Sequence, residues 1–560
     1  MILVIAEKPS VAQSIAKVLG ATSRKDGYME GGNYIVSWCF GHLVELADAS
    51  SYDERYAKWR YDDLPIVPES WMFEVTKDKA QQFKVLSALM KDKRVTELVC
   101  ATDAGREGEL IFRLVYNKAG CTKPFKRLWI SSLEDSAIRE GFQHLRDGKE
   151  YDRLYEAALS RSKADWIVGI NGTRLFTTLY HKKLVVGRVQ TPTLAMLVER
   201  DGKISTFQKE KYFNVHVGKG DLTADLEKVK TEEEAKRIAA ACEKKQAVVS
   251  SLKRETKTVN PPKLYDLTTL QREANRYYGF TAQQTLDLVQ TLYEKKLLTY
   301  PRTDSQFITD DMEDTARQVI FIVCRQLPLF SDVSVTPDIA RVTDNSKVTD
   351  HHAILPTVQL EKQDVSALPQ SEQKILNLVG MRLLCATGEK HTYAETQITL
   401  SCESYTFKTK GKTVVQNGWK AIEELFKSSL KTKEKDDPVK SLPEVHEGDV
   451  LEGVSASVTE HFTTPPKQYT EDTLLSAMET AGNDQFDDDT EKKGLGTPAT
   501  RAGIIEKLVK SGFAERKGKS LIPTKDGYNL VCVLPEQITS PKMTAEWENT
   551  LMEIERGNAD

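Results

Sequence analysis

The sequence contains little cysteine and no long apolar segment. Its eight cysteines are scattered along the 560 residues, from Cys39 to Cys532, and no two form a CxxC pair. Because a zinc ribbon needs such pairs, we expect reduced thiols and no zinc. The apolar opening Met1–Ala6 is too short for a signal peptide, and no run reaches the roughly 18 apolar residues of a membrane helix. These absences predict a soluble, cytoplasmic protein without a membrane partner.

An excess of positive charge and a nucleotide-binding loop are also lacking. The 78 basic residues face 82 acidic ones, so any nucleic-acid binding has to depend on a local basic surface. The sequence GKT at 411–413 has Thr406 where a phosphate-binding loop requires glycine. The sequence GLGTPA at 494–499 follows an acidic stretch and contains Pro498, unlike a dinucleotide fingerprint. A nucleotide-driven motor is therefore unsupported, and no ATP requirement is expected.

Alternating strand and helix patterns indicate several domains, two of them interrupted. Strand, polar loop and helix alternate in residues 1–150, which predicts a parallel sheet with ligands at its carboxyl edge. A helical segment follows, then a β-rich segment, and then a helical segment that carries Tyr300. The chain next returns to β-rich and finally to helical sequence. The expected domains are 1–150, 151–206 with 430–560, 207–262 with 386–429, and 263–385.

The segment LLTYPRTDS, residues 297–305, places Tyr300 where a helix ends. Thr281 and Gln284 have the spacing of a capping box that begins this helix, and Gln290 and Glu294 form a polar pair directed toward the tyrosine. Pro301 cannot continue the helix, so Tyr300 is held beside the cation of Arg302. This arrangement suits an oxygen nucleophile that attacks a phosphate. The alternative is a helix that ends on a core aromatic residue with a surface arginine.

Carboxylates follow two of the expected strands. Glu7 comes after the first strand, and Asp103 and Glu107 come after another. Carboxylates gathered at adjacent strand ends repel one another unless a cation lies among them, and Mg²⁺ is the ion that such ligands and phosphate oxygens prefer. Lys8 is placed to meet a phosphate, and Gly105 lets the backbone approach a ligand, as does Gly108. The alternative is a polar loop that caps the next helix.

Basic residues gather between positions 151 and 190, where seven lysines and arginines face three acids. Such a face with Trp166 suits phosphate contact and base stacking, although an ordinary solvated surface is the alternative. GRVQTPT, residues 187–193, has few apolar anchors and is expected to be a contact loop, and Arg501 is expected to project from a helix N-terminus. His351 is a candidate phosphate contact, with a structural hydrogen bond as the alternative. The candidates of the basic segment and loop are Arg161, Asp165, Arg174, Gly187, Arg188, Val189, Gln190, Thr191 and Pro192.

Seven motifs in order make the chain resemble one family. They are AEKPSVA (6–12), TDAGREGE (102–109), RSKADWIVGIN (161–171), GRVQTPT, LLTYPRTDS, HHAILPT (351–357) and GTPATRAGII (496–505). This order resembles the type IA DNA topoisomerases over essentially the whole chain, and within them the bacterial topoisomerases III. The resemblance implies an N-terminal Toprim domain in a toroid of four domains. It implies relaxation and unlinking of single-stranded or negatively supercoiled DNA, with a helicase or a single-strand-binding protein as partner at the nucleoid.

The resemblance also implies roles for residues. Tyr300 becomes joined to the 5′-phosphate, Arg302 and Lys8 stabilise the transition state, and Glu7 moves the proton of the departing sugar oxygen. One Mg²⁺ is expected at Glu7, Asp103 and Glu107, because Gly105 replaces the second aspartate that this family usually has. A non-catalytic single-strand DNA-binding remodeller and a Toprim nuclease or primase are the alternative functions. Further residues matching positions that line the site or guide the cut strand are Arg60, Gln290, Glu294, His351 and Arg501.

Overall fold

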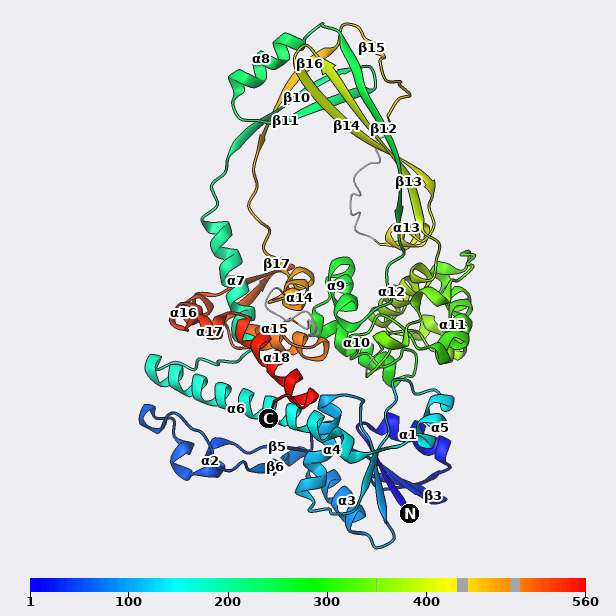
Figure 1. Ribbon diagram of the computed structural model, residues 1–560, viewed down its shortest axis with the longest axis vertical. Helices are drawn as coiled ribbons and strands as arrows, with labels where there is room; N and C mark the ends of the chain where they lie inside the picture. The colour runs from blue at the N-terminus through cyan, green and yellow to red at the C-terminus, as the bar shows by residue number, and fades with distance from the viewer. Residues whose placement is uncertain (349, 431–441, 484–493, 560) are drawn as a thin grey trace.

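The computed structural model describes residues 1–348, 350–430, 442–483 and 494–559. Its N-terminal part is a seven-stranded sheet in the order β2-β3-β4-β1-β7-β8-β9. The central strand β1 is apolar on both sides, because helices cover both faces of the sheet (Figure 1). The strands are β1 Ile2–Ala6, β2 Ser23–Lys25, β3 Tyr28–Gly31, β4 Tyr34–Trp38, β7 Glu97–Ala101, β8 Phe125–Arg127 and β9 Arg146–Asp147, and the helices are α1 Pro9–Leu19, α3 Ala80–Lys91, α4 Arg106–Lys118 and α5 Asp135–Gln143.

The register of this sheet brings two loops to one edge. Strand β1 runs parallel to β7, and Ala6 pairs with Ala101. The loops that follow both strands therefore leave the sheet side by side, one with Glu7 and the other with Asp103. A small excursion, β5 Val44–Leu46, α2 Ala49–Tyr52 and β6 Phe73–Val75, extends along the long helix α6, Asp152–Tyr180 (Figure 1).

A second seven-stranded sheet forms an arch above this base (Figure 1). Its order is β15-β12-β13-β14-β11-β10-β16, and its apolar side packs under α8, Glu232–Cys242. Strands β15 and β16 lie within the range 430–560, which the sequence predicts to be helical, and β16 joins the arch by pairing with β10 along its whole length. The strands are β10 Lys211–Lys219, β11 Leu222–Val229, β12 Ala247–Val259, β13 His391–Cys402, β14 Tyr405–Gln416, β15 Val450–Leu451 and β16 Ser455–Phe462.

Two sets of helices share the largest apolar core and complete a ring under the arch (Figure 1). One set carries Tyr300 and includes α13, Lys420–Ser429, whose Phe426 packs against Tyr277. The described residues contain no helix that combines the length and apolarity needed to span a membrane. The helices are α7 Gln190–Ser205, α9 Leu267–Tyr278, α10 Ala282–Glu294, α11 Glu313–Gln326, α12 Gln370–Ala386, α14 Glu471–Thr480, α15 Pro498–Lys510, α16 Lys525–Val533, α17 Glu536–Thr539 and α18 Lys542–Arg556; the short strands are β17 Tyr469–Thr470, β18 Ala514–Lys517 and β19 Ser520–Pro523.

Candidate active site

The end of α10 fixes the position of Tyr300. The helix begins with the predicted capping box, in which Thr281 and Gln284 each bind the other's backbone N–H. After its last residue, Leu297 and Leu298 are buried, and the backbone N–H of Thr299 donates to the carbonyl of Leu355 at 2.9 Å. Tyr300 is therefore held on an anchored segment outside the helix.

The ring of Tyr300 lies against Lys8, which follows the first strand of the N-terminal sheet, and against two aromatic rings of its own part of the chain. The Lys8 ammonium is 4.1 Å from the ring centroid, which is a cation–π contact. The His351 ring lies 4.4 Å away, and the Tyr293 ring packs edge-on at 5.4 Å between centroids. Burial raises the pKa of the Tyr300 phenol, and the neighbouring Lys8 offsets part of that rise. The predicted nucleophile therefore meets the strand end that the sequence singled out.

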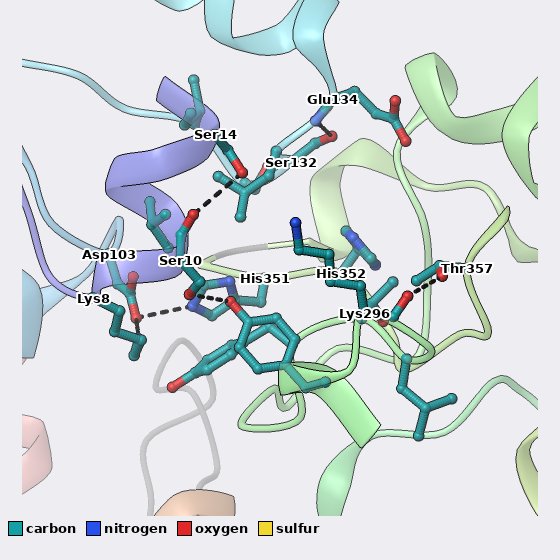
Figure 2. Close-up of a pocket in the computed structure, with 18 of the residues that line it drawn as sticks. Lys8, Ser10, Ser14, Asp103, Ser132, Glu134, Lys296, His351, His352 and Thr357 are labelled. Atoms are coloured by element: carbon teal, nitrogen blue, oxygen red, sulfur yellow. Dashed lines mark hydrogen bonds and ion pairs between the residues drawn. The ribbon is translucent and has the colours of Figure 1, made fainter. Parts of the chain in front are cut away.

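Lys8 joins the two strand-end carboxylates. Its ammonium lies 2.6 Å from Oδ2 of Asp103 and 2.9 Å from Oε1 of Glu7, and Nε2 of His351 is 3.0 Å from the same Asp103 oxygen (Figure 2). Burial lowers the pKa of Lys8, but Asp103 and Glu7 outweigh burial and hold it well above its usual range. Burial raises the pKa of Asp103, but His351 and Lys8 outweigh it and hold that pKa far below the usual range. Burial and repulsion from Asp103 raise the pKa of Glu7.

A cavity of about 910 Å³ opens over these groups, and Arg302 lines it together with Gln290 and Glu294. The Gln290 amide donates to the Glu294 carboxylate at 3.0 Å, as the polar pair predicts. Arg302 is exposed, and within the described chain the structure gives it no hydrogen bond or ion pair. Its guanidinium is therefore available to an anion that enters the cavity.

Glu107 and Glu109 point away from Glu7 and Asp103. Glu107 accepts from His42 at 2.7 Å and lies 3.4 Å from Arg161. Glu109 is fully buried and pairs with Arg127 at 3.0 Å, while Arg127 also donates to the carbonyl of Asp103 at 2.6 Å. The buried pair therefore braces the backbone that presents Asp103.

Gly105, just before α4, and Gly108, in its first turn, each have atoms of the protein itself against them, whereas the sequence suggests that they let a ligand approach. A Cβ at Gly108 would lie 2.1 Å from the Asp103 carbonyl oxygen. A Cβ at Gly105 would meet the carboxylate of Asp350. Glycine at 108 thus permits the turn from β7 into α4.

Several predicted DNA contacts are buried away from Tyr300. The segment 187–193 is not an exposed loop: residues 187–189 form a packed turn and residues 190–193 are the first turn of α7. Arg188 binds Asp165 at 2.8 Å, and the backbone N–H of Gly187 donates to the Thr191 hydroxyl. Arg188 is 8 % exposed and also lies over the Trp547 ring. Gln190, Thr191 and Pro192 are buried as well, Val189 is half-buried, and small polar side chains here pack as closely as apolar ones.

Arg174 and Arg501 are also buried, and both donate hydrogen bonds to oxygen atoms of the protein itself. Arg174 is 4 % exposed and donates to the carbonyl of Tyr56, and Arg501 is 2 % exposed and donates to the hydroxyl of Thr268. Burial lowers the pKa of both guanidinium groups. Arg60, in contrast, is exposed, and Arg161 is partly exposed beside Glu107.

Residues that sequence reasoning did not single out join the two halves of the site. The hydroxyls of Ser10 and Tyr293 are 2.8 Å apart, and the Thr315 side chain lies close enough to the Glu134 carboxylate to offset part of the rise in its pKa that burial causes. Ser10 stands in the AEKPSVA motif, which offered a hint, whereas Tyr293 recurs at the helical spacing of the apolar residues Leu286 and Val289, which predicts a core position. No local pattern pairs Glu134 with Thr315, which are 181 positions apart in the sequence.

The fold and site define a protein in which a tyrosine faces the acidic strand ends of a Toprim-like sheet. The Toprim domain family matches residues 2–133, and the DNA topoisomerase family matches residues 149–560. DNA topoisomerase 3 of Bacillus subtilis (strain 168) is 41% identical over 575 aligned residues, which cover 99% of this chain and 78% of the relative. DNA topoisomerase 3 of Bacillus licheniformis is 40% identical over 586, with the same coverage. The chain belongs to the type IA DNA topoisomerase family.

A solved structure shows the same fold. Full-length topoisomerase I from Thermotoga maritima superposes with a TM-score of 0.72 at 24% identity, covering 100% of this chain and 87% of that one. The protein is thus an isomerase that acts on DNA and has the toroidal architecture that the motif order implies.

Toprim domains generally bind Mg²⁺, so we asked whether the residues at this site could hold that ion. No group of three or more histidine, cysteine or acidic side chains in the described ranges converges as a preformed site. Glu7 and Asp103 nevertheless both approach one point, which the Lys8 ammonium now occupies. Two carboxylates directed at one cationic group are the hard oxygen donors that Mg²⁺ prefers. The residues present therefore fit the ion.

Proposed function

We propose that Tyr300 is the nucleophile of strand cleavage. Its phenol oxygen attacks a backbone phosphorus, the bond from phosphorus to the 3′-oxygen breaks, and the 5′-phosphate stays on the tyrosine. The phenol gives up its proton, and the departing 3′-oxygen gains one. Resealing reverses each step. Because the phosphotyrosine conserves the energy of the phosphodiester, the reaction needs no ATP.

The observation that carries this proposal is the contact between the Tyr300 ring and Lys8 at the Toprim strand end. In the proposed mechanism Lys8 and Arg302 stabilise the negative charge of the pentavalent phosphate. Glu7 exchanges the proton of the 3′-oxygen, and His351 orients the phosphate from the tyrosine side. Four groups on two separate parts of the chain then surround one phosphate.

Mg²⁺ is assigned to the Toprim side of the site. Glu7 and Asp103 would hold it, and Glu107 joins only if it leaves His42 and Arg161. When bound, Mg²⁺ neutralises charge on the carboxylates and on DNA phosphate. Lys8 would then be released from the carboxylates toward the incoming phosphate.

The proposed substrate is single-stranded or negatively supercoiled DNA, as the resemblance of the seven motifs to the type IA family implies. Another strand passes through the break before resealing, which relaxes or unlinks the DNA. Exposed Arg60 and partly exposed Arg161 contact phosphates of the cut strand. A helicase or single-strand-binding protein is the proposed partner, and the nucleoid in the cytoplasm the proposed location.

The test is to trap the cleaved strand. End-labelled single-stranded DNA is mixed with protein and Mg²⁺ and then denatured. We expect a covalent adduct on the 5′ side of the break, reduced at least about a thousandfold in Tyr300→Phe, since that change removes the attacking oxygen. Tyr293→Phe, in the adjacent ring, is the matched control and should keep the adduct. Free cleaved ends in all three proteins would indicate a nuclease, and binding without cleavage would indicate a remodeller.

A further inference from the structure

Residue 105 is crowded by a side chain from the other half of the site. A Cβ built on Gly105 would lie 2.5 Å and 2.8 Å from the two carboxylate oxygens of Asp350. The backbone of Gly105 is extended, with φ −169°, a conformation that any residue adopts. A side chain at 105 would therefore displace the Asp350 carboxylate, although the backbone there would accept any residue. The space beside residue 105 belongs to the Asp350 carboxylate.

Asp350 lies beside the carboxylates proposed to hold the ion. The next residue, His351, lies 3.0 Å from the Asp103 carboxylate, and the backbone N–H of Gly105 donates to the Asp103 carbonyl. Asp350 lines the same cavity as Glu7, Asp103 and Tyr300. A carboxylate from the tyrosine-bearing part thus lies against the loop that carries Asp103.

We propose that Asp350 supplies a further carboxylate to the Mg²⁺ site, in place of a side chain at residue 105, from across the gate, the boundary where the tyrosine-bearing part meets the Toprim domain. This assignment rests on the proposed ion site at Glu7 and Asp103. Its consequence is a coupling between the ion and gate closure. Asp350 moves with Tyr300, so the full ligand set exists only while the tyrosine-bearing part is closed on the Toprim domain. Ion binding and closure then stabilise each other by the same free energy.

The first test measures Mn²⁺ binding by electron paramagnetic resonance, with DNA-free protein and no Mg²⁺. We expect Asp350→Asn, which keeps size and hydrogen bonding, to weaken binding about tenfold or more. Asp103→Asn should weaken it further. Unchanged binding in Asp350→Asn with loss in Asp103→Asn would overturn this inference and leave the ion site standing. Unchanged binding in both variants would remove the proposed ion site itself.

The second test moves the carboxylate back to the Toprim side. In Gly105→Asp combined with Asp350→Gly, the new side chain enters the space that Asp350 vacates. We expect Mn²⁺ affinity to return to within about threefold of the parent protein. Affinity as weak as that of Asp350→Asn would contradict the inference. Gly105→Asp alone should be worse than the pair, because its Cβ meets the Asp350 carboxylate.

The same variants separate binding from closure. Spin labels at residues 134 and 315, on opposite sides of the gate, report the closed population by their distance distribution. In the parent protein with Asp350 intact, we expect Mg²⁺ to raise that population. In the swapped pair, Mg²⁺ should bind without raising it, since every ligand is then on one side. Closure by Mg²⁺ in the swapped pair equal to that of the parent would exclude Asp350 as the coupling group.

Discussion

The Lys8 ammonium interacts with three groups of the site. It contacts Glu7 and Asp103 and lies against the ring of Tyr300. Because the two carboxylates hold the pKa of Lys8 above its usual range, the side chain stays charged at any pH the enzyme meets. The site thus keeps a resident cation where a phosphate has to be received.

At Asp266, a buried carboxylate predicts how stability depends on pH. Asp266 caps α9 by accepting from the Thr269 N–H, and burial raises its pKa from 3.8 to about 6. The folded state therefore binds more protons between these values, and stability falls as pH rises through that window, by at most about 3 kcal/mol. Asn caps equally well and does not ionise. The melting temperature of Asp266→Asn relative to the parent should rise by a few degrees between pH 4 and pH 7; parallel melting curves would contradict this.

At the scale of elements, where a helix begins was easier to predict from the sequence than which residues are buried. The capping box at Thr281 follows a local rule, and α10 begins there. The segment 187–193 was expected to be exposed because it has few apolar residues. Its burial depends on Asp165 and Trp547, which approach Arg188 from distant elements. Local composition cannot report such partners.

Helix α18 is fastened to the Toprim domain by one residue of the TDAGREGE motif. Arg106 donates to Glu548 at 2.9 Å and also to Glu555, and it is mostly buried. Replacing Arg106 by Ala leaves both acids without this partner and should lower the local opening free energy of α18 by about 1–3 kcal/mol.

Hydrogen exchange across Lys542–Arg556 measures this loss. The matched control is Arg556→Ala, which removes a solvent-exposed pair with Glu553 on the same helix and should change exchange little. Equal exchange of α18 in Arg106→Ala and the parent would show that the helix is held by packing alone.

At the scale of the whole molecule, several polar contacts join the two sides of the gate. Ser10 meets Tyr293, His351 meets Asp103, and Glu134 meets Thr315. Polar contacts of this kind suit a ring that opens and closes, since a large apolar interface would hold it shut. The order of seven motifs was enough to predict the ring. These cross-gate pairs were not predictable, because each joins residues far apart in sequence.

A covalent lock across the gate should separate cleavage from strand passage. Cysteines at 134 and 315, joined by oxidation in a Cys532→Ser background, hold the gate shut at its rim. We expect the cleavage adduct to persist and relaxation of a supercoiled plasmid to be lost, with recovery on reduction. The single Glu134→Cys protein is the control. Relaxation at the parent rate in the cross-linked protein would show that the ring opens elsewhere.

The most direct measurement is mass spectrometry of the trapped DNA adduct after trypsin digestion. Cleavage after Lys296 and Arg302 releases the peptide Leu297–Arg302, in which Tyr300 is the sole tyrosine. We expect this peptide to carry a nucleotide through its 5′-phosphate, in a phosphotyrosine bond. A nucleotide on any other peptide, or linked through a 3′-phosphate, would contradict it.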